Sequence, residues 1–280
     1  MALLGTDFVR ARHEWLYNPR LTQPVVVAFG LFAVLILLHL LVYQTAMALL
    51  IYPFLYGDAP AAAAGTTDAA IKSRLITASV VGIAPAALLT IATAFWFRTI
   101  STAGRNHALA LNWPRLGVAG WILTIVGFLV VMYATVALLV LALGIDPNAY
   151  SPTGGLNADN SSGLIERAMA ELRQQPLLFA FTLPGIVVLV PFAEELLFRG
   201  VLFAAIAQTP VGRWGAVLIT AAGWAVVHAF TAPWFFVGVI FIMGVVLGVL
   251  LLRFGSLWIT TACHAVWNGI TSAAIFGLAS

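Results

Sequence analysis

The stretch PFAEELLFRG, residues 191–200, places Glu194, Glu195 and Arg199 inside an otherwise apolar part of the chain. No charged residue occurs in 186–190 before it or in 201–207 after it. Because an ionisable group is costly to keep in hydrocarbon, its presence inside a membrane span indicates a functional site. The rest of the sequence decides whether this stretch crosses a membrane.

The composition is that of a membrane protein. Of the 280 residues, 62% are hydrophobic and 8% are charged. A water-soluble domain has a charged fraction of about 25%. The chain is therefore predicted to be an integral membrane protein embedded in a lipid bilayer. Its small net charge of +3 gives no indication of nucleic-acid binding.

Seven apolar runs are long enough to cross a hydrocarbon core of about 30 Å as helices. They cover residues 25–52, 75–97, 117–143, 177–207, 214–230, 234–252 and 256–277. The sequence therefore predicts an all-α polytopic protein that forms a single integral membrane domain over residues 1–280.

The basic residues lie mainly in alternate loops. One set of loops carries Arg10, Arg12, Arg20, Arg98, Arg105, Arg115, Arg213 and Arg253. The loops on the other side, 53–74 and 144–176, balance basic with acidic residues. Because basic residues are enriched in cytoplasmic loops, we expect a cytoplasmic N-terminus and an outer C-terminus. Abundant Arg and Ala suggest a bacterial source, and hence the bacterial inner membrane.

The outer loop, 144–176, begins with turn residues and then becomes helical in pattern. Leu164, Ala168 and Leu172 recur at helical spacing, with charged residues on the other side of the helix. We expect an amphipathic helix along the outer membrane surface. It would serve as a connector or as a substrate gate.

The last four predicted spans carry the residues with acid–base or metal-binding chemistry. Glu194 lies 14 residues before Gln208, and His228 lies 14 residues after Trp214. At 1.5 Å per residue, two helices that leave the same cytoplasmic turn bring both groups about 21 Å into the membrane. Glu194 and His228 can therefore face each other.

The seventh predicted span adds His264 and Asn268 near this depth. They follow Ser256, at the next cytoplasmic turn, by eight and twelve residues. The same rise places them about 12 and 18 Å into the membrane. Their agreement in depth with Glu194 and His228 favours one shared site over scattered structural polar residues.

Spacing within the fourth span divides the two glutamates. Glu195 and Arg199 are four residues apart and can form an ion pair on one helix face. Glu194 points about 100° away from Glu195. It can take a proton from water and return it to a leaving group. We therefore interpret Glu194 as a general base that the Glu195–Arg199 pair supports.

Two mechanisms fit these groups, and both hydrolyse an acyl or amide bond. In one, Glu194, His228 and His264 hold zinc, which lowers the pKa of its bound water. In the other, Glu194 activates water without a metal, one histidine assists, and the other histidine stabilises an oxyanion together with Asn268. The lone Cys263 excludes a cysteine-pair metal site.

Three ordered motifs resemble those of the CAAX protease and bacteriocin-processing family, to which the Ras-converting prenyl endopeptidases belong. The motifs are Glu194-Glu195-x-x-x-Arg199, Trp224-x-x-x-His228 and His264-x-x-x-Asn268. The resemblance covers roughly residues 177–277. Residues 1–176 carry no motif of the family.

The resemblance implies an intramembrane endopeptidase that cleaves a peptide or a membrane-protein substrate. Glu194 would activate the water and Glu195 and Arg199 would support it, while His228, His264 and Asn268 would be the other catalytic or metal-binding residues. Zinc is the one cofactor implied. We interpret 1–143 as scaffold helices, 144–176 as the outer loop and 177–277 as the catalytic four-helix core. The family usually has Phe at Trp224, so we expect a narrower pocket there.

A second hypothesis is a transport or immunity protein that uses the buried Glu and His residues as an ion or proton relay, or as a structural core. Transporters show inverted repeats and paired broken helices. The sequence has no inverted repeat or matched pair of broken helices, although Pro184-Gly185 and Pro191 interrupt the fourth span. His39 in the first span has no ionisable neighbour, so we expect a structural role. Gly238, Gly244 and Gly248 in the sixth span include a four-residue step between small residues, which predicts close helix packing.

Overall fold

The computed structural model describes residues 3–17, 19, 24–57, 68–100, 109–145, 168, 171–229, 232 and 234–275. These residues form helices and connecting segments, with no strand among them. Within the described residues, five helical stretches are long and apolar enough to cross a membrane, namely Val25–Tyr56, Ala70–Phe97, Val118–Leu143, Pro176–Ile206 and Trp234–Phe254. The predicted all-α membrane fold is therefore confirmed.

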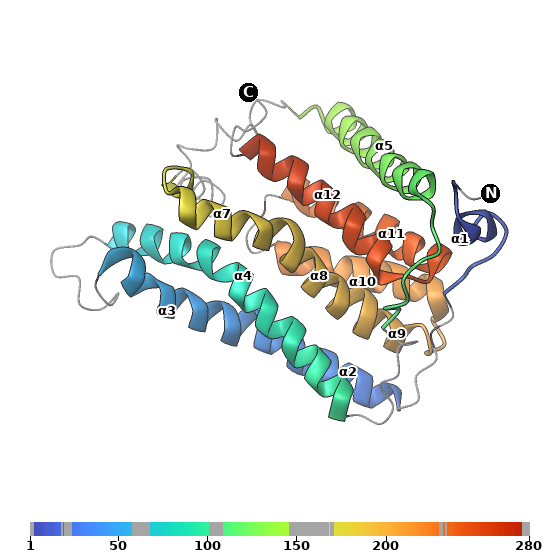
Figure 1. Ribbon diagram of the computed structural model, residues 1–280, viewed down its shortest axis with the longest axis horizontal. Coiled ribbons are helices and arrows are strands. Elements are labelled where there is room, and N and C mark those ends of the chain that lie inside the picture. Colours follow the sequence, from blue (N-terminus) through green and yellow to red (C-terminus); the bar gives the residue numbers. More distant parts are fainter. Residues whose placement is uncertain are drawn as a thin grey trace. The chain divides into compact units, whose positions relative to one another are not determined.

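The first three spans contain five of the helical elements, of which Figure 1 labels α2, α3, α4 and α5. A short helix, α1 (Thr6–Arg10), precedes them. The first span consists of α2 (Val25–Leu37), the π-helix η1 (Leu38–Tyr43) and α3 (Gln44–Tyr56). The second and third spans are α4 (Asp68–Ile100) and α5 (Val118–Leu143).

The fourth span is built from five consecutive segments. They are α7 (Pro176–Pro184), η4 (Gly185–Leu189), α8 (Val190–Glu195), η5 (Leu196–Leu202) and α9 (Phe203–Ile206). Next come α10 (Gly212–His228), α11 (Trp234–Phe254) and α12 (Leu257–Ile275). The helices α10 and α12 occupy the fifth and seventh predicted spans but are not among the five stretches, so the count of seven stays a prediction.

The interruptions predicted in the fourth span take the form of π-helical turns. The N–H of Val190 donates to the carbonyl of Gly185, and that of Phe203 donates to Phe198, a spacing of five residues in each case. Pro191 has no N–H to donate. The helix therefore continues past the prolines, with its register shifted by wider turns on both sides of Glu194 and Glu195.

The chain divides into two compact units, and the first comprises residues 1–34, 94–145 and 194–267. In this unit α10 and α11 lie side by side (Figure 1). A Cβ added to Gly244 would lie 2.8 Å from the Ala221 Cβ, and one added to Gly248 would lie 3.2 Å from the Val217 Cγ1. The predicted close packing at these two glycines is confirmed.

Backbone hydrogen bonds tie the N-terminal segment to the end of α11 in the same unit. The N–H groups of Leu16 and Tyr17 donate to the carbonyls of Arg253 and Leu252, at 3.3 and 3.1 Å. The Arg253 guanidinium lies 3.7 Å from the ring centroid of Trp15. At the start of α12, the Leu257 N–H donates to the carbonyl of Ala110 at 2.8 Å. Segments predicted to be cytoplasmic thus meet at one end of this unit.

The second unit comprises residues 35–93, 146–193 and 268–280. Buried His39 contacts Thr90 Oγ1 through Nδ1 at 2.7 Å, and its Nε2 lies 3.4 Å from the side-chain nitrogen of Gln44. Both ring nitrogens therefore have polar partners. This arrangement agrees with the structural role expected of His39.

The amphipathic helix predicted in the outer loop lies largely outside the described residues. Ala168 and residues 171–173 are helical, and Ala168 and Leu172 are buried. Glu171 accepts hydrogen bonds from the Tyr56 hydroxyl at 3.3 Å and from Thr77 Oγ1 at 3.1 Å. This carboxylate therefore joins the end of the loop to α3 and α4.

Gly244→Ala should destabilise the protein, whereas Gly238→Ala on the same helix should not. The new Cβ at Gly244 would collide with Ala221, and overpacking of this kind costs about 1–3 kcal/mol. A Cβ added to Gly238 would have no atom within 4 Å, so this position is the matched control. Buried Cys263 is the chain's only cysteine, and a thiol-reactive dye therefore reports thermal unfolding. Equal midpoints for the two variants would contradict the packing described.

Candidate active site

Two of the predicted site residues, His228 and His264, converge on the carboxylate of a third, Glu194, in the first unit. Glu194 lies in α8, His228 at the end of α10 and His264 in α12. The Nε2 of His228 is 3.8 Å from Glu194 Oε1, and the Nε2 of His264 is 3.8 Å from Glu194 Oε2. The residues that counting places at similar depths thus lie close together in the structure.

Hydrogen bonds at Nδ1 orient both imidazoles. The Nδ1 of His228 contacts the carbonyl of Trp224 at 2.9 Å, and the Nδ1 of His264 contacts Glu195 Oε1 at 3.1 Å. Carbonyl and carboxylate oxygens only accept hydrogen bonds, so each Nδ1 is the donor. In the neutral ring Nε2 is then the acceptor nitrogen, and in both histidines it is the nitrogen near Glu194.

Glu195 and Arg199 form the predicted ion pair. Arg199 Nη1 donates to Glu195 Oε1 at 2.9 Å, and both side chains are fully buried. Arg199 Nη2 also donates to the carbonyl of Gly244 at 3.3 Å, which ties η5 to α11. A buried charge needs this kind of pairing because desolvation is costly. The same Glu195 oxygen accepts from His264, so the pair also fixes that imidazole.

Solvent access separates the two glutamates. The side chain of Glu194 is 14% exposed, whereas that of Glu195 is 0% exposed. His228 is the more open histidine at 27%, against 3% for His264. The side chain of Glu194 is therefore partly accessible and that of Glu195 is not, so of the two glutamates only Glu194 can contact a molecule that enters the site.

Asn268 falls in the second unit. It lies one turn beyond His264 along α12, and its side-chain nitrogen donates to the carbonyl of Ile186 in η4 at 3.2 Å. Its predicted part in stabilising an oxyanion stays a prediction.

Trp224 is a further member of the site that sequence reasoning did not assign. Its indole N–H donates to Glu194 Oε2 at 3.0 Å, and its side chain is buried. We expected only a narrower pocket from this residue. Its place one turn before His228 was the available sequence signal, but spacing does not show the direction of an N–H.

Zinc would be held by Glu194, His228 and His264. Two imidazoles and one carboxylate are the donor types of a common class of catalytic zinc sites. Among the described residues, however, no group of three or more His, Cys, Asp or Glu side chains is arranged to hold a metal ion. The donor types fit zinc, and we assign no step of the reaction to a metal.

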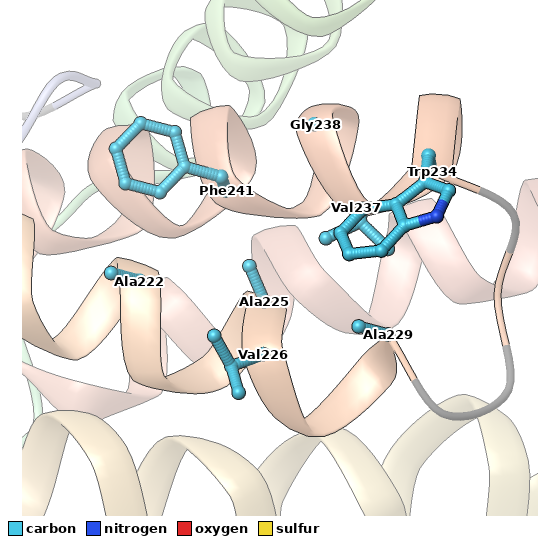
Figure 2. A pocket seen from close by; sticks show the side chains of 8 residues that line it. All are labelled: Ala222, Ala225, Val226, Ala229, Trp234, Val237, Gly238 and Phe241. Carbon is cyan, nitrogen blue, oxygen red and sulfur yellow. The ribbon is translucent and has the colours of Figure 1, made fainter.

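An apolar groove of about 650 Å³ lies between α10 and α11. Figure 2 shows Ala222, Ala225 and Val226 on α10, with Ala229 directly after it, opposite Trp234, Val237, Gly238 and Phe241 on α11. At 3.6 residues per turn, the α10 residues lie roughly 100° or more around the helix from Trp224. The groove is therefore on a different face of α10 from the site.

The comparisons with known proteins agree with this site. Residues 176–270 match the family model described as type II CAAX prenyl endopeptidase Rce1-like. The match covers about a third of the chain and includes Glu194, Glu195, Arg199, His228, His264 and Asn268. The searches of the curated proteins and of the solved structures each found no match. The segment that carries the site therefore matches a family of CAAX-type intramembrane endopeptidases, and the apolar spanning helices make the chain an integral membrane protein.

Proposed function

We propose that the protein hydrolyses a peptide bond of a peptide or membrane-protein substrate with a water molecule activated by Glu194. The observation that carries this proposal is the partly exposed Glu194 carboxylate, which has the Nε2 atoms of two histidines 3.8 Å away. Glu195 is sealed from solvent and paired with Arg199, so it supports the site without meeting water.

The reaction begins with proton transfer from water to Glu194. The water oxygen attacks the peptide carbonyl carbon, and an oxyanion forms on the carbonyl oxygen. The C–N bond then breaks, and the proton held by Glu194 passes to the leaving nitrogen. The products are a carboxylic acid and an amine, so the atoms of one water are fully accounted for.

The two histidines have different surroundings and therefore different proposed roles. His264 is buried and held by Glu195, so it fixes the second side of Glu194 and assists the proton transfer. His228 is more open, and with a proton on Nε2 it donates to the oxyanion. Zinc bound by Glu194, His228 and His264 would instead lower the pKa of the attacking water.

We propose that the enzyme lies in a bacterial inner membrane with its N-terminus in the cytoplasm. The arginine distribution supports this orientation. So does the meeting of the N-terminal segment with the end of α11 and the start of α12 at one end of the first unit.

A reporter fused to the C-terminus tests the orientation. Alkaline phosphatase folds only outside the cytoplasm, so we expect an active phosphatase fusion and a dark green-fluorescent-protein fusion at this end. A fluorescent C-terminal fusion together with an inactive phosphatase fusion would contradict the proposed topology and place the C-terminus in the cytoplasm.

Glu194→Gln should abolish cleavage without unfolding the protein. Purified wild-type protein in lipid vesicles would be given a library of membrane-anchored peptides in ¹⁸O-water, with products identified by mass spectrometry. Each new carboxyl end should carry one ¹⁸O atom. Loss of a general base lowers the rate by roughly 10²–10⁴-fold. Glu14→Gln, at an exposed glutamate paired with Arg10, is the matched control and should cleave like the wild type.

Two outcomes would contradict the proposal. Cleavage by Glu194→Gln at the wild-type rate would remove Glu194 from the mechanism. Proton uptake by the vesicles without cleavage of any peptide would favour the relay hypothesis. Metal analysis of the active protein separates the two chemical routes, because the zinc route requires one bound zinc and loss of activity with a chelator.

A further inference from the structure

Trp224 contacts four of the charged or titratable side chains at the site. Its indole N–H donates to Glu194 Oε2 at 3.0 Å. The ring meets the imidazole rings of His228 and His264 edge to face, with centroids 5.2 and 5.1 Å apart. The guanidinium carbon of Arg199 lies 4.5 Å from the centroid of the Trp224 ring.

The hydrogen bond is specific because an indole N–H can only donate. A tryptophan that is 1% exposed must find an acceptor inside the protein, and that acceptor is Glu194 Oε2. The ring itself is held by the Arg199 cation and by the two histidines. These ring contacts hold the indole N–H of Trp224 in place, and the N–H in turn fixes the direction of the Glu194 carboxylate.

The hydrogen bond to one carboxylate oxygen of Glu194 also sets the direction of the other oxygen. With Oε2 bound to the indole, Oε1 faces the more open histidine, His228, at 3.8 Å. A carboxylate that rotated freely would present either oxygen to water. In a fraction of the molecules it would then not be aligned with the attacking water. Catalysis depends on such alignment, since small misplacements of reacting groups lower rates strongly.

We propose that Trp224 is a positioning residue, whose indole N–H holds Glu194 in the orientation needed to activate water. This inference rests on the proposed function of Glu194. It gives Trp224 a role beyond the narrower pocket expected from the sequence, because a phenyl ring at this position has no donor to offer.

The sharpest test replaces only the donor. Incorporation of β-(benzothienyl)alanine at position 224 exchanges the indole N–H for sulfur and keeps the bicyclic shape and the ring contacts. A hydrogen bond to a charged group contributes roughly 10- to 100-fold. We expect kcat to fall by about this factor, with KM within about twofold, because Trp224 does not touch substrate in this account. Trp224→Phe should show the same split between kcat and KM.

Controls separate a positioning role from a structural one. The unfolding midpoint, read with the dye at Cys263, should change little for the benzothienyl variant, and tryptophan incorporated by the same method should restore the wild-type kcat. A wild-type kcat in the benzothienyl variant would overturn the inference, as would a fall in kcat that follows loss of folded protein. If Glu194→Gln in the same assay is also fully active, the proposed function itself fails. If only Glu194→Gln is inactive, the inference about Trp224 alone fails.

Discussion

The buried ion pair between Glu195 and Arg199 is the interaction on which the rest of the site depends. Arg199 binds Glu195, the carbonyl of Gly244 and the face of Trp224, while Glu195 also holds His264. These contacts join η5, α10, α11 and α12. Losing one partner of a buried pair costs about 3–5 kcal/mol, because the remaining charge is left without compensation. This fully buried ion pair therefore positions the side chains that surround Glu194.

The two adjacent glutamates obtain different chemistry from different access to solvent. Glu195 is completely enclosed and serves as an anchor, whereas Glu194 is partly open and has two Nε2 atoms and an indole N–H around its carboxylate. A π-helical turn lies before them and another lies after them, and turns of this kind occur frequently at functional sites. A single helix face could not have given the two carboxylates such different surroundings.

Much of this site follows from the sequence, and the remainder depends on side-chain rotation. Counting residues from the cytoplasmic turns places Glu194, His228 and His264 at related depths in the membrane. The four-residue spacing of Glu195 and Arg199 predicts their ion pair. Depth does not fix helix rotation, so the bridge that His264 makes between both glutamates was not predicted. The bond from Trp224 to Glu194 joins residues 30 positions apart and depends on a rotamer. The π-turns shift the hydrogen-bond register without any sequence period that marks them.

The claim that these residues form one hydrolytic site is tested most directly by a double-mutant cycle on His228 and His264. The measurement is kcat/KM for cleavage of one membrane-anchored peptide by the wild type, His228→Ala, His264→Ala and the double variant. Both imidazoles face the same Glu194 carboxylate, so the account predicts strong non-additivity, with the double variant little slower than the slower single variant. Effects that simply multiply, as for two distant and independent positions, would contradict a single shared site.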